Sequence, residues 1–262
     1  MSNTTPKGRL LLVPTPLDFG CAPELVAPIA DTLPAHTITQ AAQTTHWITE
    51  NAKSTRAFLN RVATHTPLAC SMQDMQLQVL PREAHKSGDH TASAMDAQAK
   101  VWLAPALQGF DVGLVSEAGM PAIADPGSSV VRAAHAMGLA VVPLSGPVSL
   151  MLALAASGLN GQQFAFVGYL KKGAELTAHI KALEATALKT GQTQLCIETP
   201  YRNTQLLQTL IATLSPNTRL AVASGLAVAP EVFSQTATAW REQAKHNKLP
   251  ALGLPAVFLW GP

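Results

Sequence analysis

Residues 111–158 limit the possible folds of this chain more than any other part of the sequence. Val112–Val115 is a short apolar run, which predicts a buried strand. Asp125 followed by Pro126 predicts the start of a helix that a glycine ends, and Leu139–Leu144 predicts a second strand. A strand, a helix and a strand form a βαβ unit, with parallel strands and a right-handed crossover.

Two turns of this segment carry glycine and proline. The loop Glu117–Asp125 contains Gly119, and the turn at Gly146 is followed by a predicted helix, Val148–Ser157. We expect both turns beyond the carboxyl ends of neighbouring strands, where open parallel sheets bind ligands. The glycines would let the backbone approach a ligand, although each turn alone is also explained as a tight connection.

The composition describes a well-packed globular protein. Of 262 residues, 47% are hydrophobic and 13% are charged, which excludes a disordered chain and permits one or two α/β domains. The net charge of +2 comes without a Lys/Arg run, so the basic signature of a nucleic-acid binder is weak. Cys21, Cys70 and Cys196 fit no metal spacing and are expected to be reduced thiols.

We expect a cytoplasmic protein. The first residues, MSNTTPKGR, lack the apolar core of a signal peptide. Leu139–Leu159 is nearly all apolar and long enough for a membrane span. Pro143, Gly146 and Pro147 interrupt it, however, and the strand, turn and helix described above account for each of them.

The rest of the chain predicts alternating strands and helices. Strands are expected at Arg9–Val13, His46–Thr49, Leu77–Leu80, Phe164–Leu170, Gln194–Glu198, Arg219–Ser224 and Ala256–Trp260. Helices are expected near Glu24–Leu33 and at Lys53–Val62, Ala97–Leu107, Ala174–Leu188 and Gln205–Leu214, with a turn at Thr199–Arg202.

Two α/β domains are expected, with a boundary near Gly146. The first, residues 1–146, has a mainly parallel sheet, and the second, residues 147–262, has a mixed sheet because some of its connections are short. Residues 82–96 predict a polar loop, whose His85 and His90 do not make a metal site without further ligands.

Three motifs in order carry a resemblance to a known family. VSEAGMPAIADPG, VVPLSGP and IETPYR resemble the tetrapyrrole methylase superfamily of S-adenosylmethionine-dependent methyltransferases. Within it, they resemble the branch that 2′-O-methylates a cytidine of small-subunit ribosomal RNA. The resemblance covers nearly the whole chain, and implies two α/β domains, S-adenosylmethionine in the cleft between them, and a homodimer.

The chain departs from that branch at three motifs. The first strand is followed by PTPLDF rather than an ATPIGN-type turn, and Ile48–Lys53 stands in place of an AEDTR-type motif. Glu117 and Met120 replace the usual Asp and Thr of the central loop. These departures are typical of a divergent paralogue, in which the cofactor site carries over more directly than the RNA substrate.

The resemblance implies cofactor contacts at four places in the sequence. They are Ser116, Glu117, Ala118, Gly119, Met120 and Ile123 on the central loop, Gly146, Val148 and Ser149 at the elbow, and Thr199, Pro200, Tyr201, Ser224, Gly225 and Leu226 further on. Methyl transfer from a sulfonium is an in-line displacement that depends on positioning more than on a metal, so no metal is expected.

The acceptor and the catalytic base remain open at this level. An alcohol acceptor needs a base for its proton, and Glu50, Glu117 and Glu198 are candidates, although for each carboxylate taken alone a structural role is favoured over a catalytic one. RNA would need cations, for which we predict a basic mouth of Lys53, Arg56 and Arg202, with ordinary ion pairs as the alternative. A small-molecule, tetrapyrrole-like acceptor and a non-catalytic cofactor-binding module are the other hypotheses. Sparse charge also favours a homodimer.

Overall fold

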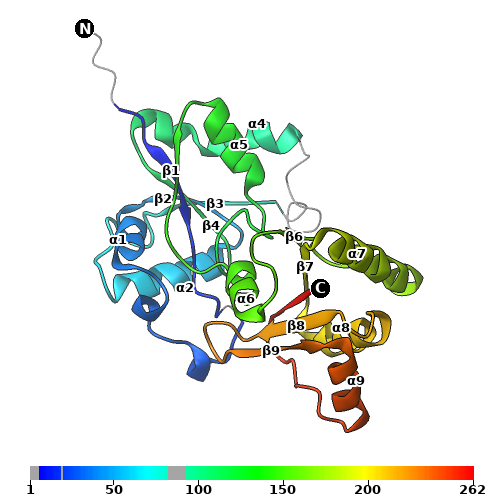
Figure 1. Cartoon of the computed structure of the whole chain (residues 1–262). Helices are drawn as coiled ribbons and strands as arrows, with labels where there is room; N and C mark the ends of the chain where they lie inside the picture. Colours follow the sequence, from blue (N-terminus) through cyan, green and yellow to red (C-terminus); the bar gives the residue numbers. More distant parts are fainter. Residues whose placement is uncertain (1–5, 19, 82–92) are drawn as a thin grey trace. The chain divides into compact units, whose positions relative to one another are not determined.

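The chain folds into two α/β units, residues 1–148 and 149–262, as shown by the computed structural model (Figure 1). The structure describes residues 6–18, 20–81 and 93–262. Of the predicted polar loop, residues 82–92 lie outside the described part, and the rest belongs to a helix that begins at Ser93.

A five-stranded parallel sheet forms the first unit, in the order β3-β2-β4-β1-β5. Its strands are β1 (Arg9–Val13), β2 (His46–Thr49), β3 (Gln76–Val79), β4 (Val112–Val115) and β5 (Ala140–Pro143). The expectation that the two strands of the central segment are neighbours was wrong, because β1 pairs with β4 on one side and β5 on the other. The apolar strand β1, in which Leu10, Leu11 and Val13 are at most 1% exposed, thereby occupies the interior of the sheet.

Helices cover both faces of this parallel sheet. On one face, α1 (Ala35–Gln43) and α2 (Ala52–Ala63) pack on Leu11 and Val13. On the other, α4 (Ser93–Trp102) and α5 (Ser128–Ala136) pack on Leu10. Successive side chains of a strand point to opposite faces, so one apolar run in β1 serves both layers. Figure 1 shows α4 and α5 together, apart from α1 and α2.

The first predicted helix of this unit was wrong. In place of a helix near Glu24–Leu33 there are two short 3₁₀ turns, Pro23–Leu25 and Ile29–Asp31, and α1 starts only at Ala35. Pro28 and Pro34 precede the second 3₁₀ turn and α1 directly, and proline disfavours a helical conformation in the residue before it.

The start of α5 also differs from the prediction. The helix begins at Ser128 rather than after Asp125, and its N-cap is Gly127 at φ 137° without a side-chain cap. Asp125 remains in the preceding loop, where its side chain meets other polar groups described below. Gly138, at φ 63°, follows the helix as expected.

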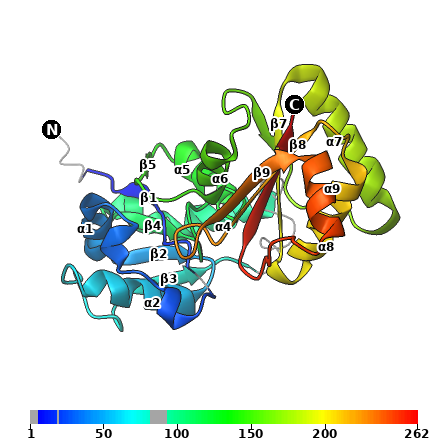
Figure 2. The same cartoon turned by 60° about the horizontal axis from the view of Figure 1, so that its bottom comes forward.

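The second unit contains the expected mixed sheet, in the order β6-β7-β10-β8-β9 (Figure 2). Its strands are β6 (Phe164–Phe166), β7 (Thr193–Glu198), β8 (Arg219–Ser224), β9 (Glu231–Thr236) and β10 (Ala256–Gly261). Only β6 and β7 pair in parallel, and the other pairings are antiparallel. The prediction omitted β9, a half-exposed edge strand with the weakly apolar sequence EVFSQT.

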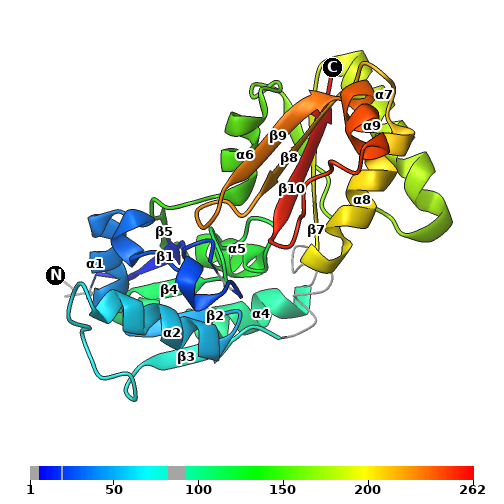
Figure 3. The ribbon, with the colours of Figure 1, turned by 90° about the horizontal axis from the view of Figure 1, so that it is seen from below.

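Four helices complete the second unit. The apolar helix α6 (Ser149–Ser157) packs on one face of the sheet, and α7 (Leu176–Thr190), α8 (Pro200–Thr213) and α9 (Ala237–Lys245) pack on the other (Figure 3). The polar helix α9 was not predicted. The predicted turn Thr199–Arg202 is instead the start of α8, since Thr199 is its N-cap and Pro200 suits the first helical position.

Within the described residues, no helix is long and apolar enough to cross a membrane. The apolar stretch 139–159 folds as β5, a proline-bearing turn and α6.

Candidate functional site

Three adjacent strands of the first unit end at one edge of its sheet. Thr15 lies shortly after β1, Glu50 directly follows β2, and Ser116 and Glu117 follow β4. Because β2, β4 and β1 are neighbours and parallel, their carboxyl ends bring these polar residues together. The predicted cofactor loop and two of the three candidate bases therefore occupy one edge.

A short bridge ties the loop after β4 to the loop after β1. The amide of Thr15 donates to the carbonyl of Gly119 at 3.0 Å, and the amide of Gly119 donates back at 3.1 Å. Gly119 has φ +79°, and a Cβ there would lie 3.0 Å from Leu17 Cδ2. A side chain would be strained in this conformation, so the bridge favours glycine.

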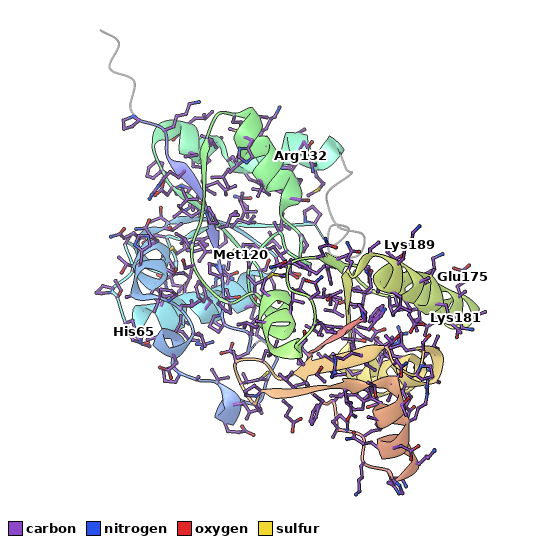
Figure 4. All side chains as sticks on the ribbon, viewed as in Figure 1. His65, Met120, Arg132, Glu175, Lys181 and Lys189 are labelled. Atoms are coloured by element: carbon purple, nitrogen blue, oxygen red, sulfur yellow. The ribbon has the colours of Figure 1, made fainter. Side chains whose placement is uncertain are left out.

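The residues around this bridge fit the S-adenosylmethionine that the resemblance implies. Among the described residues, the backbone groups of Ala118 and Met120 make no hydrogen bond, so they can pair with the edge of an adenine or an amino acid. Met120, labelled in Figure 4, is half-buried, and Ile123 is 43% exposed. Backbone donors and acceptors beside apolar side chains are typical of small-molecule sites.

The same loop contains two alanines in a left-handed conformation. Ala122 and Ala124 have φ of 64° and 62°, a region that non-glycine residues rarely adopt, and they flank the exposed Ile123. Strained backbone of this kind costs about 1–3 kcal/mol per residue and gathers at functional loops. The strain therefore supports a role for this loop in binding.

Three carboxylates converge beside the loop. The amide of Glu117 donates to Glu50 Oε2 at 3.2 Å. Burial first, and then the charge of Glu50, raise the pKa of Asp125 to about 7; a hydrogen bond from Ser116 opposes the rise and the charge of Glu117 adds to it. Carboxylates whose charges interact in this way can hold a proton near neutral pH. Within the described ranges, no group of His, Cys, Asp and Glu is arranged to hold a metal ion.

A pocket of about 550 Å³ opens at this edge, which we call the carboxyl-edge pocket. All of its lining residues belong to the first unit. The lining combines apolar side chains with charged, hydroxyl and amide groups, and consists of Thr15, Pro16, Asp18, Val26, Asn51, Lys53, Ser54, Ala57, Phe58, Arg61, Ser116 and Glu117. Glu117 thus connects the pocket to the predicted cofactor loop, whereas Glu50 is not among the lining residues.

The cations near the pocket differ in their surroundings. Arg61 is held by Asp18 at 2.9 Å and donates to the carbonyl of Ala27 at 3.0 Å, so it fixes the loop after β1 to α2. Lys53 is exposed, lines the pocket and makes no ion pair with any described residue. Arg56 lies on the same helix and is also exposed, but it is not among the lining residues.

Gly146 has a packing role in the structure. A Cβ at this position would lie 2.3 Å from Pro14 Cγ and 3.1 Å from Leu33 Cδ2. The preceding carbonyl, of Ser145, accepts a hydrogen bond from Thr37 Oγ1 at 2.7 Å. The glycine therefore lets the turn after β5 pack on the loop after β1. Val148 and Ser149, the next predicted contacts, are both half-buried.

The predicted site residues of the second unit lie around the start of α8. Glu198 accepts hydrogen bonds from the amide and hydroxyl of Thr199 at 2.9 and 3.1 Å, and pairs with Arg202 at 3.3 Å. These contacts stabilise the N-terminus of α8. Pro200 is at the first helical position, while Tyr201 is 82% exposed and available to a ligand.

The turn after β8 holds the remaining predicted contacts. The amide of Gly225, at φ +63°, donates to the carbonyl of Pro255 at 3.2 Å, and a Cβ there would lie 2.4 Å from the carbonyl oxygen of Ala229. Ser224 is 3% exposed, and the neighbouring Leu226 is half-buried. Glycine at position 225 is thus required by the turn itself.

Sequence reasoning missed two parts of the site. Asp125 was interpreted as the N-cap of a helix. The N-cap in the structure is Gly127, so the side chain of Asp125 does not cap the helix. Asp18 and Arg61 are 43 positions apart in the sequence, so their ion pair has no local signal.

The chain belongs to the family of Tetrapyrrole (Corrin/Porphyrin) Methylases, whose model matches residues 34–242. It is 35% identical over 129 residues to a ribosomal RNA small subunit methyltransferase I of Vibrio cholerae, which covers 49% of this chain and 44% of that protein. The protein of the same description from Escherichia coli O157:H7 is 34% identical over 130 residues, with the same two shares.

The match spans less than half the length of these curated relatives. Among solved structures, uroporphyrin-III-C-methyltransferase from Thermus thermophilus aligns with 97% of this chain and 94% of its own, at 16% identity and a TM-score of 0.49.

Proposed function

We propose that this chain is an S-adenosylmethionine-dependent methyltransferase that acts on RNA. The observation that carries the proposal is the first unit's sheet edge, where a strained loop with free backbone groups adjoins a pocket ending in a carboxylate. Family membership supports methyl transfer, and relatives described as ribosomal RNA methyltransferases support RNA as the acceptor.

In this proposal, the loop Ser116–Met120 and Ile123 hold the cofactor, with further contacts from Tyr201 and from Ser224–Leu226. The cofactor supplies an electrophilic methyl group bound to sulfur. The chain's own residues orient the acceptor hydroxyl and accept its proton as the new carbon–oxygen bond forms.

Glu117 is the base that we assign among the three candidates. It lines the pocket, whereas Glu50 lies behind it and accepts its amide hydrogen. Glu198 is 5% exposed at its side chain and is engaged with Thr199 and Arg202.

We further propose that the protein is a cytoplasmic homodimer. Met151 and Leu152 on α6 are 40% and 42% exposed, and apolar surface of this kind favours association. A monomeric mass by light scattering at micromolar concentration would contradict the dimer.

The test uses S-adenosylmethionine with a labelled methyl group, offered with total RNA and, separately, with a metabolite extract. We expect labelled RNA, and for Glu117→Gln a fall in kcat of about 100-fold or more. Glu24→Gln, an exposed carboxylate elsewhere in the first unit, is the matched control and should keep full activity. Label in the metabolite extract alone would establish a small-molecule acceptor, and cofactor binding without transfer would establish a non-catalytic module.

A further inference from the structure

The carboxyl-edge pocket is lined by a negative and a positive side chain that come from two different elements. Glu117 and Ser116 belong to the loop after β4, and Lys53, with Asn51 and Ser54, belongs to the first turn of α2. The lining also contains apolar side chains, among them Phe58 from the next turns of α2. A ligand that fills the pocket would therefore meet a carboxylate from one element and an ammonium from another.

Most charges around the pocket are already engaged within the protein. Asp18 and Arg61 form an ion pair with side-chain exposures of 11% and 28%. Lys53 has no ion pair with a described residue. Lys53 is thus the cation in the lining that an anionic ligand can bind without breaking an existing pair.

We infer that the carboxyl-edge pocket binds one nucleotide of the RNA acceptor, with its phosphate at Lys53 and its sugar hydroxyls toward Glu117. This inference rests on the proposed RNA methyltransferase function and adds the residue that recognises the phosphate. The volume of about 550 Å³ falls within the range of about 300–1,000 Å³ that is usual for small-molecule sites. Its apolar side chains, which include the aromatic ring of Phe58, suit the flat face of a base.

Lys53 and Arg56, which the sequence assigns to the same basic mouth, differ in their position relative to the pocket. Lys53 and Arg56 are three positions apart on α2 and both are exposed, but only Lys53 lines the pocket. If RNA were attracted only by the overall positive potential of the surface, Lys53 and Arg56 would contribute equally, because such a potential acts over about a Debye length. If one phosphate is contacted directly, only the cation that lines the pocket can make that contact.

The experiment measures binding of nucleoside 5′-monophosphates and of the matching nucleosides to the whole protein by titration calorimetry. The variants are Lys53→Gln, Lys53→Arg and, as the matched control, Arg56→Gln. We expect the wild type to bind the monophosphate on the order of tenfold more tightly than the nucleoside. Lys53→Gln should reduce this preference to less than about twofold, while Lys53→Arg and Arg56→Gln should retain it.

A second variant tests the pocket rather than the charge. Ala57 is exposed and lines the pocket, so Ala57→Phe should fill part of it and weaken binding of nucleoside and monophosphate alike. The inference is overturned if the wild type shows no preference for the phosphate, if Arg56→Gln removes it as fully as Lys53→Gln, or if Ala57→Phe has no effect.

The outcomes for this inference and for the proposed function can be told apart. A phosphate preference that depends on Lys53, in a protein that methylates no RNA, would support the nucleotide pocket and reject the proposed activity. RNA methylation with a phosphate preference that is unchanged in Lys53→Gln would support the activity and reject the pocket assignment.

Discussion

The two units use their buried and half-buried polar side chains in different ways. In the second unit these side chains fasten loops: Glu184 accepts from the Ser215 amide at 2.6 Å and from Thr218 Oγ1 at 2.5 Å, and Asn203 Nδ2 donates to the carbonyl of Leu254 at 2.9 Å. In the first unit, Glu50, Glu117 and Asp125 gather at one sheet edge instead.

Sheet topology explains the cluster in the first unit. A parallel sheet directs every carboxyl end to the same edge, so the residues that follow β1, β2 and β4 meet. In the second unit, β7 and β8 both run antiparallel to β10, so Glu198 and Ser224, each opposite Ala256, also lie at one edge. There Glu198 is engaged with Thr199 and Arg202, and Glu184 and Asn203 lie on helices instead. The difference therefore lies in which residues follow the strands, since only the first unit brings several carboxylates to one edge.

The largest expected effect is on the packing of the first unit. Gly146→Val should lower its free energy of unfolding by about 3 kcal/mol or more, because the new Cβ would lie 2.3 Å from the rigid ring of Pro14. Hydrogen exchange should show lost protection in β1 and β4, with β8 and β10 unchanged. Gly161→Val, where a Cβ has no neighbour within 4 Å, is the control. Equal loss of protection in both units would show that their cores do not respond separately.

A smaller effect is expected for Glu198, whose carboxylate is hydrogen-bonded and ion-paired within the second unit. Glu198→Gln keeps an acceptor for Thr199 but leaves Arg202 without its charge partner, so it should cost about 1–3 kcal/mol in urea unfolding. Glu242→Gln removes a pair whose side chains are 57% and 67% exposed, and should leave the urea midpoint nearly unchanged. If the two variants cost the same, Glu198 has no special structural role.

Local sequence patterns predicted best the strands whose apolar runs are buried in the sheet. The bounds of β1, β2, β4 and β8 agree with the prediction residue for residue. Strand order could not be predicted in this way, since the placement of β1 between β4 and β5 depends on pairings between distant residues. The elements that were missed, β9 and α9, have polar and half-exposed sequences; α9 is amphipathic, but its apolar face is small, with Ala237 and Trp240 buried.

The sequence indicated which residues belong to the candidate site better than it indicated how they are arranged in space. Loop 116–120 and Glu50 were found because family motifs mark them, and the structure brings both to one edge. The role of Gly146 was inferred from its residue type alone, and its contact with Pro14 required the tertiary structure. The place of Asp125 among the carboxylates was hidden because a proline after an aspartate is also the usual signal of a helix start.

The smallest expected effect concerns Asp125 and depends on pH. Its pKa is raised from 3.8 to about 7 in the folded protein, first by burial and then by the charges of Glu50 and Glu117. Below about pH 4, Asp125 is protonated in both the folded and the unfolded states. Between about pH 4 and pH 7 the folded state keeps a proton that the unfolded state has released, so the free energy of unfolding falls as pH rises.

Asp125→Asn removes this titration while keeping a side chain of similar shape. The variant should therefore gain stability relative to the wild type as pH rises from 4 to 8, by about 1 kcal/mol once solvent screening at a partly exposed site is allowed for. Tm measured for both proteins across that range tests the sign, and Asp31→Asn, at an exposed position, is the control. A difference in Tm that does not change with pH would mean that neither burial nor the charges of the neighbouring carboxylates raise the pKa of Asp125 in the folded protein. The parallel sheet edge would then concentrate polar groups without coupling their charges, and the contrast with the second unit would be one of position alone.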